Sequence, residues 1–277
     1  MDLYTKVAFQ NARSLTNAYS SSFSLSSRLF SKEIRHHIYA IYGLARIADE
    51  IVDTYREGNA ERKLNDLEVE TYHAIEDGYS TNLIVHAFAY TAQFCDMPKD
   101  IVQALFTSMR MDLKPQNYTK ELYQKYIYGS AEVIGLMCLR VFCEGDVATY
   151  KELAPGAQKL GSAYQKVNFL RDISADYKEL GRLYFPGLSY GKFSEADKRK
   201  LIQEITKEFN EAEISIRQLP KNGRAAVTAS YIYYRTLLSK LEAASVADIK
   251  NSRIRINNAK KMAILSYVYI KSKLGLV

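Results

Sequence analysis

The stretch IYGLARIADEIVD, Ile41–Asp53, is apolar on almost every side when it is wound into a helix. A helix that is hydrophobic all round belongs in the protein interior. Asp49 and Asp53 nevertheless share one helical face at i and i+4, and Arg46 lies one turn earlier. Buried charges are costly unless charged partners compensate them. The stretch therefore predicts a buried helix with a polar site, although an Arg46–Asp49 pair on a solvated face is the simpler alternative.

A second acidic stripe occurs in QKVNFLRDISAD, Gln165–Asp176. In a helix, Asn168, Asp172 and Asp176 fall at i, i+4 and i+8 and line up on one face. Taken alone, this stripe would be an ordinary polar helix face. Two such stripes in one helical chain predict more, because helices that face each other would form a single pocket of oxygen ligands.

That pocket has the chemistry of a magnesium site. Mg²⁺ binds one or two carboxylates, keeps several waters and bridges to phosphate oxygens, and Mn²⁺ accepts the same hard oxygen ligands. Neither stripe contains His or Cys, so zinc is not expected. The predicted metal ligands are Asp49, Asp53, Asn168, Asp172 and Asp176.

The remaining sequence shows helical periodicity and no convincing strand alternation, so we expect one all-α domain over residues 1–277. Helices are expected at about 3–18, 31–56, 60–77, 80–94, 98–111, 119–144, 156–179, 195–218, 223–245 and 250–273. All five prolines are expected between helices, where they break none of them. Ser31 and Ser194 are expected to cap helix starts, and His36 and His37 are expected to be exposed.

Composition indicates a soluble protein of a reducing compartment. The 38 Lys and Arg residues exceed the 31 Asp and Glu residues, which favours an anionic partner. Cys95, Cys138 and Cys143 are too few for a disulfide framework and are expected to be buried thiols. The first residues lack the apolar run of a signal peptide. We therefore expect a cytoplasmic protein, with peripheral membrane contact through Lys260, Lys261, Lys271 and Lys273 as an alternative.

Five blocks, in order along the chain, carry a resemblance to a known family. They are SSSFS (20–24), AIYGLARIADEIVD (40–53), YIYGSAEVIGLM (126–137), QKVNFLRDISADYKELGRLYFP (165–186) and NSRIRINNAKK (251–261). In these blocks the sequence resembles the squalene and phytoene synthase family, and it looks most like the short bacterial phytoene synthases. One block would be a weak signal, whereas five in the family order are specific.

The resemblance implies a helical bundle around a central apolar cavity. It also implies two prenyl diphosphates as substrates and Mg²⁺ as cofactor. In this family, the first diphosphate ionises to an allylic cation, the double bond of the second substrate attacks that cation, and a cyclopropyl diphosphate forms. A second ionisation and rearrangement then give the long hydrocarbon.

The resemblance also carries roles over to individual residues. The catalytic residues would be Asp49, Asp53, Asp172, Asp176, Tyr128 and Arg171. Residues that bind the substrate, as diphosphate-binding arginines, cavity wall or N-terminal flap, would be Ser20, Ser22, Phe23, Tyr42, Arg46, Gln165, Asn168, Tyr234 and Arg253. The flap here lacks the basic residue that some relatives have.

Several alternatives remain open within and beyond the family. Two C20 substrates would give phytoene, which we favour, and two C15 substrates would give squalene or dehydrosqualene, with NADPH needed only for a reduced product. Some relatives are non-catalytic assembly factors, but these have lost acidic ligands. A head-to-tail elongase or terpene cyclase would have adjacent carboxylates in a different first motif. A nucleic-acid binder would cluster its Lys and Arg, which are mostly dispersed here. The sequence contains no signal for oligomeric state.

Overall fold

The computed structural model describes residues 1–55, 58–114 and 117–277, without the side chains of Ser21 and Ser22. The regular secondary structure in these ranges is helical. Within those ranges no strand is present, which confirms the expected all-α class. The helices are α1 (Leu3–Tyr19), α2 (Ser21–Ser26), α3 (Lys32–Asp53), α4 (Ala60–Asp77), α5 (Leu83–Phe94), α6 (Lys99–Met111), α7 (Lys120–Ile127), α8 (Val133–Cys143), α9 (Val147–Leu180), α10 (Glu195–Gln218), α11 (Lys221–Ala243), α12 (Val246–Asn251) and α13 (Asn258–Lys273). Short 3₁₀ turns lie at Ser27–Leu29 and Tyr190–Lys192, and a π-helical turn at Tyr128–Glu132 joins α7 to α8.

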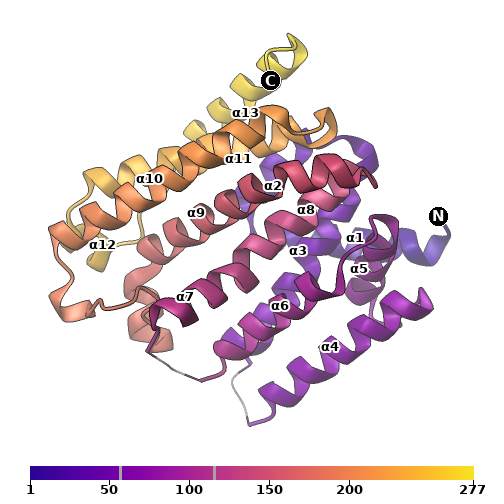
Figure 1. Cartoon of the computed structure of the whole chain (residues 1–277), viewed down its shortest axis with the longest axis horizontal. Coiled ribbons are helices and arrows are strands. Elements are labelled where there is room, and N and C mark those ends of the chain that lie inside the picture. The colour runs from indigo at the N-terminus through magenta and orange to yellow at the C-terminus, as the bar shows by residue number, and fades with distance from the viewer. Residues whose placement is uncertain (56–57, 115–116) are drawn as a thin grey trace.

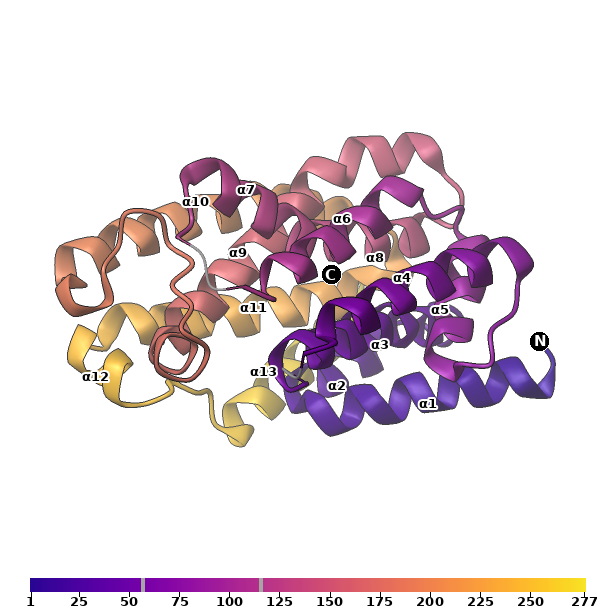
Figure 2. The same ribbon diagram turned by 90° about the horizontal axis from the view of Figure 1, so that it is seen from below.

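The 34-residue helix α9 runs through the middle of the bundle and packs against α8, α10, α11 and α12 (Figure 1). The first half of the molecule packs α3 against α1, α5, α6 and α8. Seen from below, α1 lies along one edge of the bundle, and α11 runs through its centre (Figure 2). One apolar core surrounds α3, α5, α6 and α8, and a second surrounds α7, α9, α10 and α11. The two acidic helices, α3 and α9, thus belong to different cores.

Local chemistry explains how α9 and α10 begin and end. The carboxylate of Asp146 accepts hydrogen bonds from the amides of Ala148 and Thr149 and so caps the start of α9. Gly181 ends that helix with a left-handed φ of 67°, which favours glycine. Ser194 and Asp197 form a reciprocal capping box at the start of α10, as expected. Ser31, also expected to be a cap, makes no side-chain capping bond.

Three expected boundaries are wrong. Pro155 lies inside α9, not before it. Proline has no amide proton for the carbonyl of Lys151, but both residues are exposed, so water can bind that carbonyl and the helix tolerates the proline. The expected helix 119–144 is interrupted by the π-helical turn. The expected helix 250–273 is two helices, α12 and α13, joined by an extended segment.

Two glycines allow the central helices to approach closely. A Cβ atom on Gly129 would lie 2.3 Å from the carbonyl oxygen of Ala104 on α6, and one on Gly135 would lie 2.6 Å from that of Ala157 on α9. Both distances are far below van der Waals contact, so no larger residue fits without moving a backbone. Gly129 therefore serves helix packing alone.

His37 is buried rather than exposed, which corrects the expectation for this residue. It is only 2% exposed, its ring stacks on Phe94 at 4.2 Å, and its Nδ1 lies 2.9 Å from the hydroxyl of Thr91. His36 is partly buried and packs edge-on against Phe9. Burial, followed by the neighbouring His36, lowers the pKa of His37 to about 3. The folded protein therefore holds this imidazole neutral.

We expect the buried His37 to make the protein less stable in mild acid. Its pKa is lower in the folded state than the ordinary value of about 6.5, so the unfolded chain binds the extra proton as the pH falls. The contribution is complete above pH ~6.5 and declines as the pH approaches ~3, and at pH ~5 the loss is on the order of 2 kcal/mol. Urea unfolding at several pH values should show a shallower pH slope for His37→Gln. The exposed His73→Gln is the matched control, and equal slopes for wild type and His37→Gln would contradict the prediction.

Candidate active site

A cavity of about 490 Å³ lies among α2, α3, α8, α9, α11 and α13. This volume is in the range of small-molecule binding sites. Its wall is mostly apolar and includes Ile38, Ile41, Ile134, Leu139, Phe142, Leu153, Leu160, Ile216 and Leu219. Eight of the predicted site residues also line it, namely Ser20, Phe23, Tyr42, Arg46, Asp49, Gln165, Asn168 and Tyr234. Because Asp49 belongs to α3 and Asn168 to α9, the two acidic helices face the same cavity.

On α3, the polar side chains form a compact charged group. Arg46 donates a hydrogen bond of 2.5 Å to Asp49 and a second one to Glu50, so the i, i+3 pair of the simpler alternative is present. The guanidinium also lies 4.3 Å from the ring centre of Tyr19. Side chains of Arg46 and Asp49 are 26% and 33% exposed, so the group is partly buried.

On α9, Asp172 is held by two arginines. Arg171 approaches it with Nε 2.9 Å from one carboxylate oxygen, and Arg253, from the segment before α13, approaches with Nε at 2.7 Å and a second nitrogen at 3.0 Å. Burial favours the neutral acid, but these two guanidinium groups outweigh it and lower the pKa of Asp172. Arg253 thus meets two neighbouring predicted site residues, although it lies 81 positions from Asp172 in the sequence.

Asp53 and Asp176 connect the two stripes electrostatically. Burial, followed by the charge of Asp172 and that of Asp53 on α3, raises the pKa of Asp176 to about 7 against the lowering effect of Arg182. Burial and Asp53 likewise raise the pKa of Asp49 to about 7. The carboxylates of the two helices therefore repel one another and are not fully compensated by the protein's own cations.

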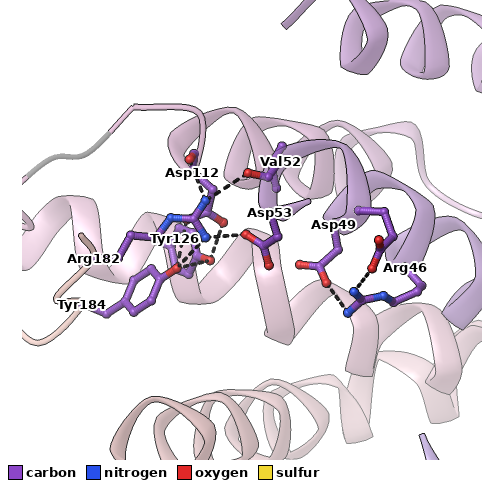
Figure 3. Close-up of polar contacts among 9 residues, drawn as sticks. Arg46, Asp49, Val52, Asp53, Asp112, Tyr126, Arg182 and Tyr184 are labelled. Atoms are coloured by element: carbon purple, nitrogen blue, oxygen red, sulfur yellow. Dashed lines mark hydrogen bonds and ion pairs between the residues drawn. The ribbon is translucent and has the colours of Figure 1, made fainter. Parts of the chain in front are cut away.

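A buried network that the sequence analysis missed holds Asp53 in place (Figure 3). Arg182, which follows α9, donates to Asp53 at 2.5 Å and to the carbonyl oxygens of Val52 and Asp112 at 3.2 and 2.8 Å. The carboxylate of Asp112 accepts hydrogen bonds from Tyr126 at 2.6 Å and from Tyr184 at 3.0 Å. The network thus ties the end of α3 to α6, α7 and the segment after α9.

The family of this chain follows from its sequence as a whole. The sequence profile described as squalene/phytoene synthase matches residues 16–260. The chain belongs to the squalene/phytoene synthase family. This confirms the resemblance carried by the five sequence blocks, and both family and fold are those of prenyl-transferring enzymes.

Individual relatives agree with this assignment to the squalene/phytoene synthase family. A chloroplastic phytoene synthase of an Oncidium hybrid cultivar is 30% identical, over 96% of this chain and 68% of its own length. A solved dehydrosqualene synthase has the same fold, with a TM-score of 0.81 at 22% identity over 97% of this chain and 98% of its own. A squalene synthase from Alicyclobacillus acidocaldarius gives a TM-score of 0.77 at 21% identity, over 88% and 96%.

Within this squalene/phytoene synthase fold, six of the predicted residues do not line the cavity. Five of them belong to the charged groups described above, namely Asp53, Arg171, Asp172, Asp176 and Arg253, and the sixth is Tyr128. Tyr128 packs with Tyr150 against the core of α3, α5, α6 and α8 and does not line the cavity. The tyrosine of this stretch that lines it is Tyr126, two residues earlier. The role of Tyr128 rests on the resemblance alone, and residues two positions apart lie on different sides of a helix.

Two pairs of stacked aromatic rings form part of the cavity wall. Phe23 of the flap helix α2 stacks on Tyr42 at 5.1 Å, and Tyr164 stacks on Tyr234 at 4.0 Å. The Tyr234 hydroxyl donates to Asn168 at 3.3 Å. Ser20 caps α2 by accepting a hydrogen bond from the amide of Phe23. The side chain of Ser22, the third predicted flap residue, lies outside the described part of the structure.

The donor set of the site fits a magnesium ion that is shared with a phosphate ligand. Among the described residues, no three acidic, His or Cys side chains are close enough to hold a metal ion by themselves. Buried carboxylates with raised pKa values nevertheless leave negative charge to compensate. Mg²⁺ is typically bound by one or two carboxylates together with phosphate oxygens and water, which suits Asp49 and Asp53 on one side and Asn168, Asp172 and Asp176 on the other.

We expect the Arg182–Asp112 pair to be essential for stability. Arg182→Met leaves Asp112, a buried carboxylate, without its cation and should lower the free energy of unfolding by about 3–5 kcal/mol. Adding Asp112→Asn removes the orphaned charge and should restore part of that loss, with a coupling of about 1–3 kcal/mol in urea unfolding. Arg217→Met breaks an exposed ion pair and serves as the control, with little expected effect on stability. Strictly additive losses for the pair would contradict this role.

Proposed function

We propose that this chain is a Mg²⁺-dependent enzyme that joins two prenyl diphosphates head to head through a cyclopropyl diphosphate, and that its substrates are two C20 chains that give phytoene. The observation that carries the proposal is one cavity with two kinds of wall. A long apolar wall lies beside a polar group from α3 and α9. A prenyl diphosphate has the same division, an apolar chain and a charged head.

The arginines of the site are suited to the diphosphate group. Arg46, Arg171 and Arg253 currently bind carboxylates, and a guanidinium offers the same two-pronged geometry to phosphate oxygens. Diphosphate departs readily only when its negative charge is compensated. A bound Mg²⁺ would supply further positive charge to the leaving group. The side chains that hold such an ion would be the five predicted on α3 and α9, four carboxylates and the amide of Asn168.

The apolar wall is suited to the reactive carbocation. Away from the charged group, the cavity is lined mostly by apolar side chains. A cation that forms there is therefore kept from water that would quench it. Tyr42, Tyr126, Tyr164 and Tyr234 line the cavity, and aromatic faces attract a desolvated cation by about 2 kcal/mol. Ser130 and Gln165 lie 3.4 Å apart and add a neutral polar contact.

A C15-using enzyme is the second candidate, and the structural neighbours named dehydrosqualene synthase and squalene synthase favour it. It would give dehydrosqualene or, with NADPH, squalene. The phytoene synthase relatives favour the C20 substrate. A non-catalytic assembly factor is less consistent with the sequence, because all five predicted ligand positions keep Asp or Asn.

We expect Asp49→Asn and Asp172→Asn each to lower turnover at least ~100-fold, since each removes a charge needed to hold Mg²⁺ against a diphosphate. Product formation should be measured with labelled prenyl diphosphate at saturating Mg²⁺, and the fold should be checked by thermal unfolding. Asp66→Asn, an exposed carboxylate on α4, is the matched control and should leave turnover unchanged. Chelation with EDTA should stop the wild-type reaction and added Mg²⁺ should restore it. Turnover that is indifferent to chelation would remove the metal from the proposal.

We expect C20 diphosphate to be the better substrate. Incubation with C15 and with C20 diphosphates, each with and without NADPH, separates the candidates by the mass of the hydrocarbon. Phytoene from the C20 substrate at a higher kcat/KM supports the first proposal. A C30 hydrocarbon formed preferentially would assign the chain to the C15 class. A folded protein that yields no hydrocarbon from either substrate would support the assembly-factor alternative.

A further inference from the structure

The final part of the chain, residues 249–277, differs from the rest in its charge. The whole chain has 38 Lys and Arg and 31 Asp and Glu. Residues 249–277 contain seven of the basic residues and none of the acidic ones, so residues 1–248 contain 31 of each. The formal net charge of +7 is therefore concentrated on α13 and the short stretch before it. Net charge confined to one surface attracts an anionic partner to that surface.

The outer face of α13 is also apolar. Met262, Tyr267, Ile270 and Leu274 lie along it, each between 50% and 67% exposed, and Leu276 follows just beyond the helix at 64%. Single exposed apolar residues are common, but a row on one helix face marks an interaction surface. In Figure 1 the C-terminal end of α13 extends beyond the other helices, which leaves this face open.

Lysines and tyrosines share this surface. The ammonium of Lys271 lies 4.9 Å from the ring centre of Tyr267, and that of Lys273 lies 5.7 Å from the ring centre of Tyr269. A lysine that lies along an aromatic ring can bury its methylene stem and keep its charge at a polar boundary. Tyrosine has the same dual character and is enriched where membrane meets water.

The inner face of α13 forms part of the cavity wall. Ile264 and Val268 are buried, and the helix packs on α11 and α2. Lys261, Ile264 and Leu265 line the cavity on this side. One helix therefore separates the apolar cavity from the basic, apolar outer surface.

We propose that the outer face of α13 docks on an anionic lipid bilayer, with its lysines at the headgroups and its apolar side chains in the interface. Charge complementarity and the exposed apolar row select this partner, because an anionic bilayer offers both negative charge and apolar depth. The proposed contact is with the membrane surface, not an insertion across it. Among the described helices, only the segment Lys120–Cys143 is apolar and long enough to span a membrane, and more than half of it is buried in the bundle. The charge and the exposure of this surface do not depend on the proposed reaction.

Vesicle flotation of the full chain tests the proposal. We compare vesicles of phosphatidylcholine alone with vesicles that also contain phosphatidylglycerol, at low salt and at ~1 M NaCl, where the Debye length is about 3 Å. Wild type should bind the anionic vesicles at low salt and lose most of that binding at high salt. The triple variant Lys260→Gln, Lys271→Gln, Lys273→Gln should lower the partition coefficient on the order of a hundredfold. The pair Ile270→Ser and Leu274→Ser should also weaken binding to anionic vesicles.

A matched control separates this surface from net charge alone. Lys151→Gln, Lys200→Gln and Lys207→Gln remove the same charge from exposed positions on α9 and α10 and should leave most of the binding intact. In Figure 2, α10 and α13 lie on opposite sides of the bundle. Equal losses in the two triple variants, unchanged binding of the Ile270/Leu274 pair, or no vesicle binding by wild type would each overturn the proposal. Retention of wild type on an RNA oligonucleotide without binding to vesicles would also overturn it and assign the surface to nucleic acid.

Discussion

Repulsion between buried carboxylates is the constraint on which the rest of this structure depends. Asp49 and Asp53 on α3 interact with Asp172 and Asp176 on α9, and burial, followed by the charges of Asp53 and Asp172, raises the pKa values of Asp49 and Asp176 to about 7. The protein compensates them unevenly. Two arginines hold Asp172, and Arg182 holds Asp53, whereas Asp176 remains undercompensated. Under the proposed function, bound cations and a diphosphate would compensate the charge that remains.

The apolar helices beside this charged group enclose a cavity. Glycine at 135 brings α8 within backbone contact of α9, so the helices are close where they touch. Between those contacts, aliphatic and aromatic side chains line a cavity of about 490 Å³ without filling it. Close packing on either side keeps such a space from collapsing. The two cores therefore act as rigid walls for a chamber that opens toward the polar side chains of α3 and α9.

Basic residues are used in two different ways. Inside the site, Arg46, Arg171 and Arg253 are each paired with a carboxylate, and residues 1–248 carry no net charge. Outside, the lysines of α13 have no acidic residue on their own helix and lie beside exposed apolar side chains. Paired arginines suit a ligand that must be oriented, and lysines on an exposed helix face suit a broad anionic surface.

The sequence by itself determined the helical class, the two acidic stripes and the family, because these depend on local periodicity and on ordered motifs. The Arg182 network is visible only in the folded protein, because Arg182 lies 129 positions from Asp53 and 70 positions from Asp112. Asp112 belongs to no local sequence pattern that would mark it. Arg182 and Tyr184 lie two positions apart within the fourth family block, residues 165–186, but that block does not show which residues they contact. The burial of His37 and the position of Tyr126 in the cavity wall likewise follow from packing between helices. Periodicity reports which residues share a face, whereas contacts between distant helices decide what that face meets.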